Sequence, residues 1–204
     1  MRIAHCLLAM MLMGCAHMDP PALAVGQAWR FLDAPSEDAR IVIERIETRG
    51  DRRVVHASVV DLPMPPKARD LIARMEERRL EVSPEPVAEN PPTQIILSGM
   101  LGAHGEWYSG SLLLDKATGV ASIPHLAMYE DDLRSVLTEL TDTERAPGEH
   151  FAFQYQLWEQ GEREWPSLHD SELPIPLADR VRGALGGVPE LLRTLENDAP
   201  ASER

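Results

Sequence analysis

The chain has 204 residues, of which 44% are apolar and 26% are charged, and its 20 basic and 33 acidic side chains give a formal net charge of −13. This composition is typical of a globular protein, and an acidic chain without a basic tract argues against nucleic acid as a partner and against electrostatic docking on anionic lipid. No stretch of about 20 apolar residues occurs, which excludes a protein that crosses the membrane several times.

The first residues match the pattern of a bacterial lipoprotein signal. Arg2 precedes an apolar run from Ile3 to Met13, which is too short to span a bilayer but suits the hydrophobic part of an export signal. The run ends in Leu12-Met13-Gly14-Cys15, so that a small residue precedes a cysteine whose thiol can accept a diacylglycerol. We expect a signal peptide over 1–14, lipidation at Cys15 and a tether over 15–24. The alternative is a buried N-terminal helix in which Gly14-Cys15 occurs by chance.

The cysteines bear on location and on cofactors. Cys6 and Cys15 are the only two, so removal of the signal leaves a domain with neither a disulfide nor a free thiol, which an oxidising compartment tolerates. We expect the domain to be held in the cell envelope by acyl chains such as palmitate on Cys15, with the bilayer as its partner. Because Ala16 follows the cysteine, the expected place in a Gram-negative cell is the outer membrane, facing the periplasm. No cofactor is expected.

A single globular domain is expected over 25–197, and its first part is predicted to be an antiparallel meander. Strands are predicted near 25–31, 40–47 and 54–60, with a turn after Ala34 and a hairpin turn at Gly50. Regular alternation in the second strand places two sets of residues on opposite faces: Ile41, Ile43 and Arg45 on one, and Val42, Glu44 and Ile46 on the other.

The middle of the chain is interrupted by prolines. A proline-rich insertion is predicted near 63–93, with a helix-compatible stretch from Lys67 to Glu81. Short strands are predicted at 94–97, 107–114 and 120–123, with a hairpin loop over 115–119. Pro124 is predicted to end the last of these strands.

Helices are predicted in the last third. Leu133, Val136, Leu137 and Leu140 follow helical spacing, and the acidic first turn favours a helix from Glu130 to Leu140. Phe151, Tyr155 and Trp158 predict a second helix that ends at Gly161, and a third runs from Leu177 to Gly186-Gly187. The predicted fold class is α+β, an antiparallel β-meander packed against two or three helices, with a disordered tail over 198–204.

Several segments resemble an uncharacterised family of small bacterial proteins. The resemblance rests on a Gly-Gln-x-Trp opening strand within Val25–Phe31 and on an Ile-Pro-His-Leu segment at 123–126 that precedes an acidic helix. Further similar segments are Val54–Val59, Tyr155–Trp158 and Ile175–Ala178. The resemblance covers about half of the chain after the signal. It implies a fold and no particular chemistry.

Few residues carry a chemical signal. The sequence contains no G-x-S-x-G, no P-loop, no H-E-x-x-H and no histidine pair with metal-ligand spacing, so no metal is expected. His56 and His125, which the resemblance also marks, are the candidates for a polar site on one face of the sheet; the alternative is that each is a hydrogen-bonded structural residue. Trp107 and Tyr108 are the candidates for a partner contact, against ordinary packing.

Two functions remain open from the sequence. The first is a membrane-anchored envelope lipoprotein that is not an enzyme and binds a basic protein partner through its acidic surface or through the region from Pro63 to Gly119. The alternative is a small hydrolase whose site contains His56 and His125.

Overall fold

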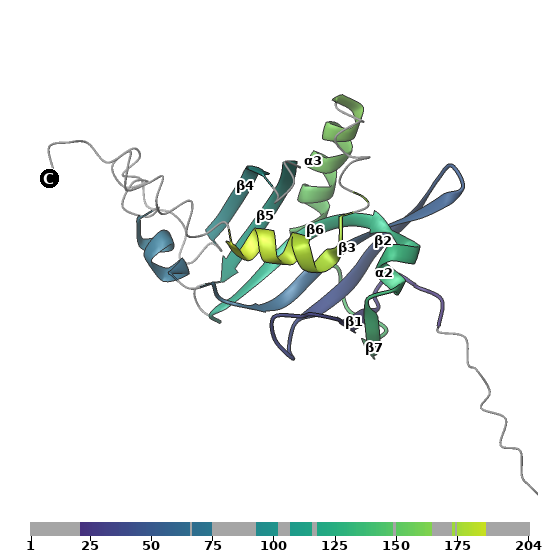
Figure 1. The fold of residues 1–204 in the computed structure, drawn as a ribbon, viewed down its shortest axis with the longest axis horizontal. Coiled ribbons are helices and arrows are strands. Elements are labelled where there is room, and N and C mark those ends of the chain that lie inside the picture. Colours follow the sequence, from purple (N-terminus) through teal and green to yellow (C-terminus); the bar gives the residue numbers. More distant parts are fainter. Residues whose placement is uncertain are drawn as a thin grey trace, which may run out of the picture.

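The computed structural model describes residues 21–65, 67–74, 93–101, 107–115, 118–148, 150–164, 173 and 175–186. Seven strands in these ranges form one sheet in the order β4-β5-β6-β3-β2-β1-β7, in which all neighbours run antiparallel (Figure 1). The strands are β1 (Ala28–Phe31), β2 (Arg40–Arg49), β3 (Arg52–Pro63), β4 (Thr93–Leu101), β5 (Trp107–Asp115), β6 (Val120–Tyr129) and β7 (Leu137–Asp142). The α+β class predicted from the sequence is confirmed.

Two meanders meet at the centre of the sheet. Strands β1, β2 and β3 form the predicted N-terminal meander, and the hairpin between β2 and β3 turns through Gly50, whose φ of 60° suits a residue without a Cβ atom. Strands β4, β5 and β6 form the second meander, and β6 pairs with β3. Strand β3 ends at Pro63, and Pro65 follows it, as the sequence indicated.

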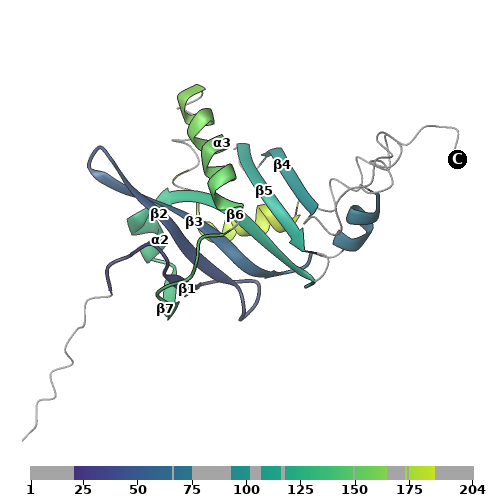
Figure 2. The same cartoon turned by 180° about the vertical axis from the view of Figure 1, so that it is seen from behind.

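Helices cover both faces of the sheet. Helix α3 (Phe151–Glu164) packs on one face, and the helix over 177–186 lies on the other, as the two opposite views show (Figures 1 and 2). The helical residues 68–74 contribute Ala68, Leu71 and Ile72 to the same core as Leu177. The two faces of the sheet therefore pack against different helices.

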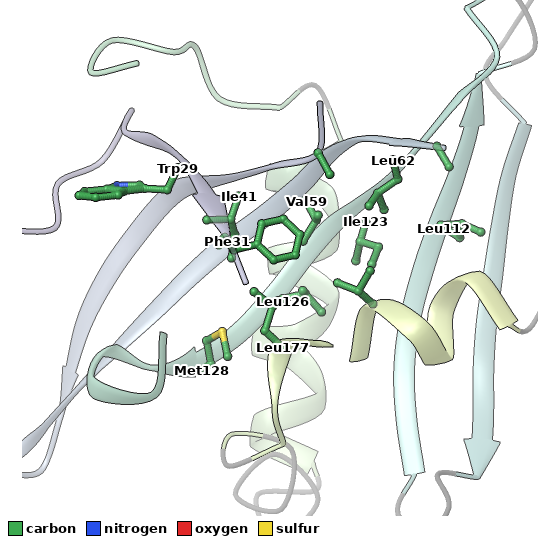
Figure 3. Packing of buried hydrophobic residues seen from close by; sticks show 14 of the residues in the cluster. Trp29, Phe31, Ile41, Val59, Leu62, Leu112, Ile123, Leu126, Met128 and Leu177 are labelled. Atoms are coloured by element: carbon green, nitrogen blue, oxygen red, sulfur yellow. The ribbon is translucent and has the colours of Figure 1, made fainter. Parts of the chain in front are cut away.

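The main core lies on the face away from α3 and consists of apolar side chains (Figure 3). Alternation along the strands brings Ile41 and Ile43 of β2, and Val55 and Val59 of β3, to this face, where all four are fully buried. Burying such a side chain contributes roughly 1.5–3 kcal/mol. The core on this face is the main source of the stability of the fold.

The helix predicted from Glu130 to Leu140 is wrong in its second half. Helix α2 covers only Glu130–Arg134, and β7 begins at Leu137 and pairs with β1. The Oγ atom of Ser135 donates a hydrogen bond of 2.6 Å to the Asp132 carbonyl at the end of the helix. Leu137 and Leu140 of the predicted helical stripe still pack against the main core, but from the strand, because the edge of β1 offers backbone partners that outweigh a helical pattern of side chains.

Two predicted ends of elements are also wrong. Strand β6 passes through Pro124 and continues to Tyr129, because the proline lies at an irregular point of the β3–β6 pairing, where its missing N–H breaks no regular ladder. Helix α3 passes through Gly161 and continues to Glu164.

Candidate functional site

The strands bring both candidate histidines to the face that α3 covers. In β3, Val55 and Ala57 belong to the main core, so His56 between them faces α3. In β6, Ile123 and Leu126 both belong to the main core. Their three-residue separation reflects the irregular register around Pro124, and it leaves His125 on the face of α3.

The two imidazole rings are in direct contact. The Nδ1 atom of His56 lies 3.1 Å from Nε2 of His125, a hydrogen-bonding distance. The ring centroids are 5.4 Å apart and the planes differ by 20°. His56 has no exposed surface, whereas His125 is partly exposed.

A bulge in β2 adds a carboxylate to this pair. The pairing of β2 with β3 shifts between Ile43 and Arg45, so the strict alternation predicted from the sequence is wrong beyond Glu44. Ile46 packs against the main core, and Glu47 faces α3 instead. The Oε2 atom of Glu47 lies 3.5 Å from Nε2 of His56, on the far side of that ring from His125.

Helix α3 covers the histidine pair with aromatic rings. Tyr155 and Trp158 meet the ring of His56 edge-on, with centroids 5.0 and 4.7 Å away, and Phe151 lies 5.7 Å from the ring of His125. The helical spacing predicted from the sequence is what places these three rings on one side of α3.

Tyr155 also bonds to the carboxylate. Its hydroxyl group donates a hydrogen bond to Oε1 of Glu47, and Nε of Arg45 donates to the same oxygen over 2.6 Å. The Arg45 guanidinium lies 4.7 Å from the centroid of the Tyr155 ring, and that of Arg49 lies 4.8 Å from the Trp158 ring. These contacts join the hairpin of β2 and β3 to α3.

A second carboxylate, which unlike Glu47 is buried, lies under the start of α3. Glu44 accepts a hydrogen bond of 2.6 Å from the Ser58 hydroxyl and one of 3.1 Å from the Gly148 N–H. Glu44 and Ser58 are 7% and 2% exposed. Together with the residues around the histidine pair, they form what we call the polar layer: Glu44, Glu47, His56, Ser58, His125 and Tyr155.

Burial sets the protonation of this layer. Loss of solvent outweighs the attraction of Glu47 and lowers the pKa of His56 to about 4, so that its ring is neutral at pH 7. Burial raises the pKa of Tyr155 to about 12, and its hydrogen bond to the carboxylate acts in the same direction. For Glu47, burial acts to raise the pKa, but the hydrogen bonds from Tyr155 and Arg45 outweigh it, and the pKa lies below its ordinary value.

The arrangement is a line of three groups: Nε2 of His56 faces Glu47 at 3.5 Å without a hydrogen bond, and Nδ1 of His56 lies within hydrogen-bonding distance of His125. Ionised Glu47 accepts only, so it favours the His56 tautomer that carries its proton on Nε2. The Nδ1 atom of His56 then accepts from Nε2–H of His125. In that tautomer His125 carries its proton on Nε2 and not on Nδ1.

Among the described residues, neither an accessible serine nor a metal site accompanies the line of Glu47, His56 and His125. The hydroxyl group of Ser58 lies in the polar layer, but it donates to Glu44 and is almost fully buried. Within the described ranges, no group of three or more His, Cys, Asp or Glu side chains could hold a metal ion.

The structure does not describe the side chains of the remaining predicted site residues. Cys15 and the signal over 1–14 fall outside the described residues. The backbones of Trp107 and Tyr108 lie in β5, opposite Leu101 and Met100 of β4, but their side chains also fall outside the description.

Sequence reasoning missed four members of the polar layer. Glu47 was assigned to a strand and Tyr155 to a helix, both without a role in a site. The bulge in β2 is what turns the Glu47 carboxylate toward the helix. Glu44 and Ser58 carried no signal either, since a strand with polar alternation ordinarily has these side chains in solvent.

The comparisons with known proteins add no relative. No protein-family model, no curated protein and no solved structure matches this chain. In the part of the chain that is described, no helix has both the length and the apolar character needed to cross a bilayer.

Proposed function

We propose that the chain is an envelope lipoprotein, anchored through acylated Cys15, whose folded domain binds a protein partner. The observation that carries this proposal is the apolar run that ends in Leu12-Met13-Gly14-Cys15. The acyl chains on this cysteine would supply the membrane attachment, at about 0.8 kcal/mol for each buried CH₂ group.

The chemistry of the polar layer supports a binding domain over an enzyme. His56 is fully buried and, with a pKa of about 4, stays neutral at pH 7. Tyr155, with a pKa of about 12, stays protonated at pH 7 and donates its hydroxyl hydrogen to Glu47. Their polar atoms contact one another across strands and helix, which is what a structural polar network does. The net charge of −13 favours a basic partner.

Cys15→Ser tests the anchor, and Cys6→Ser is its matched control because Cys6 lies within the predicted signal. Wild-type protein and Cys6→Ser should fractionate with membranes and release into detergent. Cys15→Ser should carry no acyl group, and mass spectrometry of the N-terminal peptide reads this directly. An unmodified Cys15 with Met1 still attached contradicts the anchor.

A second experiment tests the partner. The full chain is crosslinked in the envelope, and captured proteins are washed at low and at high salt before identification. A basic partner that high salt releases supports the proposal, because exposed charge pairs are screened. Recovery of no partner, even after crosslinking, counts against it.

A small hydrolase is the second candidate, and the line from Glu47 through His56 to His125 favours it. In that function His125 would act as general base, and His56 would orient it. His125→Ala should then abolish turnover of an ester or amide substrate, while His150→Ala, at the residue before α3, should leave it unchanged. A panel of such substrates that wild-type protein does not turn over excludes this function.

A further inference from the structure

We propose that the polar layer makes the docking of α3 onto the sheet depend on protonation: when His56 takes up a proton, α3 is released from the sheet. This inference rests on the packing of α3 and does not require the proposed function.

The two faces of the sheet are held differently. The opposite face is covered through a large apolar core that includes Leu177 and Val181. Among the described residues, the apolar cluster on the side of α3 comprises Val54, Ala127, Trp158 and Leu173, with Tyr129 and Tyr155 packed against it. Most of the inner face of α3 rests on imidazole rings instead, because Phe151, Tyr155 and Trp158 contact His56 or His125. The docking of α3 on the sheet therefore depends on the protonation of these imidazole rings.

A charge on His56 would meet unfavourable surroundings in the docked state. Glu47 is the acidic group that faces its Nε2 atom, but Oε2 stands 3.5 Å away without a hydrogen bond to the ring, and Oε1 accepts from Arg45 and Tyr155. Arg45 and Arg49, both on β2, oppose a further positive charge. The ring of His56 also has no exposed surface through which water could solvate it.

The remaining titratable neighbours do not offset this. His125 of β6 faces Nδ1 of His56, and a proton on both nitrogens of His56 would remove the acceptor that the His125 N–H uses in the neutral pair. On α3, Glu159 acts on Arg45 and Tyr155. Glu44, at the other end of the layer, is bonded to Ser58 and Gly148.

Release of α3 would remove the penalty by returning His56 to water. The pKa of the docked ring is about 4, against 6.5 for a histidine in water. Proton uptake by the released form alone then raises the equilibrium constant for release about thirtyfold between pH 8 and pH 5. Covalent bonds do not change, and the proton comes from solvent.

Hydrogen–deuterium exchange of the full chain in a non-ionic detergent measures this release. After correction for the pH dependence of intrinsic exchange, the opening constant of amides in 151–164 should rise about thirtyfold from pH 8 to pH 5. Amides of β3 open only with the whole fold, so their opening constant should stay below that of α3 at every pH. If amides of α3 and β3 have equal opening constants, or if the opening constant of α3 does not change with pH, the proposal is overturned.

Two variants assign the effect to the ring. His56→Gln has no titrating group at this position, so protection of α3 should become independent of pH, whereas His150→Gln should behave as wild type does. A pH response that persists in His56→Gln overturns the proposal. If His56→Gln does not fold, a titration of the labelled His56 ring in wild-type protein decides: release of α3 while that ring is still neutral overturns the proposal, and joint protonation and release support it.

Discussion

The Nδ1 atom of His56 and the Nε2 atom of His125 lie 3.1 Å apart although 69 residues separate them in the chain. The contact exists because β3 and β6 are neighbours at the centre of the sheet and because β6 has an irregular register next to Pro124. In a regular strand, residues two positions apart lie on the same face, so His125 would face the main core together with Ile123. One extra residue in a strand thus decides which side chains line the polar layer.

The burial of His56 predicts a pH dependence of stability. Its pKa is about 4 in the folded protein, against 6.5 for a histidine in water. Between these values the unfolded chain binds more protons, so stability is fully present above pH 6.5 and is lost as the pH falls toward 4. We expect the free energy of unfolding to be about 2 kcal/mol lower at pH 5 than at pH 7.5, measured by urea denaturation.

The same measurement on two variants provides the control for this prediction. His56→Gln should show less than half of the wild-type pH dependence, and His150→Gln should retain all of it. Equal stability of wild-type protein at pH 7.5 and pH 5 would contradict the buried, neutral state of His56.

Tyr155→Phe removes the hydroxyl group that donates to Glu47. A hydrogen bond to a charged acceptor contributes about 1.5–3 kcal/mol, and the partial exposure of this pair places the expected loss at about 1–2 kcal/mol by urea denaturation. The pKa of Glu47 should rise in the variant, because one of the hydrogen bonds that hold it down is lost. A titration of the carboxyl group by NMR checks this direction.

Tyr129→Phe is the matched substitution on the sheet. Its ring lies under the guanidinium of Arg52, 3.3 Å from the centroid, and loss of the hydroxyl group leaves that stacking in place. We expect a change of less than about 0.5 kcal/mol. A loss in Tyr129→Phe equal to that in Tyr155→Phe would mean that the bond to Glu47 has no special part in holding α3.

Local patterns in the sequence predicted much of the fold. The meander of β1, β2 and β3 follows from alternation and from turn residues such as Gly50. The inner face of α3 follows from the spacing of Phe151, Tyr155 and Trp158. The same patterns placed His56 in a strand. Each of these features depends on neighbours in the chain.

The features that local patterns missed depend on pairing between distant segments. Strand β7 exists because β1 presents a free edge to it, although Leu133, Val136, Leu137 and Leu140 have helical spacing. The bulge after Ile43 has no signal in the residues of β2 themselves. It can be recognised only when β2 is set against β3, and it is the reason that Glu47 was not assigned to the site with His56.

Ser58→Ala tests the buried carboxylate of Glu44. The hydroxyl group of Ser58 donates to Glu44, and both residues are nearly inaccessible to solvent. Its removal leaves Glu44 with the Gly148 N–H as its remaining described donor on Oε1. A buried acceptor that loses a donor costs about 1–3 kcal/mol, which thermal or urea denaturation can detect. Ser135→Ala removes an exposed hydroxyl group and should cost less than about 0.5 kcal/mol; equal effects of the two substitutions would contradict the buried role of Ser58.

One substitution at two glycines should change stability in opposite directions. Gly119 ends the loop between β5 and β6 with a φ of 71°, and Gly183 lies within the helix over 177–186; a Cβ atom added at either position meets nothing within 4 Å. Steric contacts are therefore the same for the two substitutions, and backbone conformation decides whether the free energy of unfolding rises or falls.

Gly119→Ala forces an L-residue into the left-handed region and should lower the free energy of unfolding by about 1 kcal/mol. Gly183→Ala replaces the most flexible residue by the best helix former and should raise it by about 0.5–1 kcal/mol. Urea denaturation at pH 7.5 measures both, and a Gly119→Ala variant as stable as wild type would contradict the positive φ at that turn.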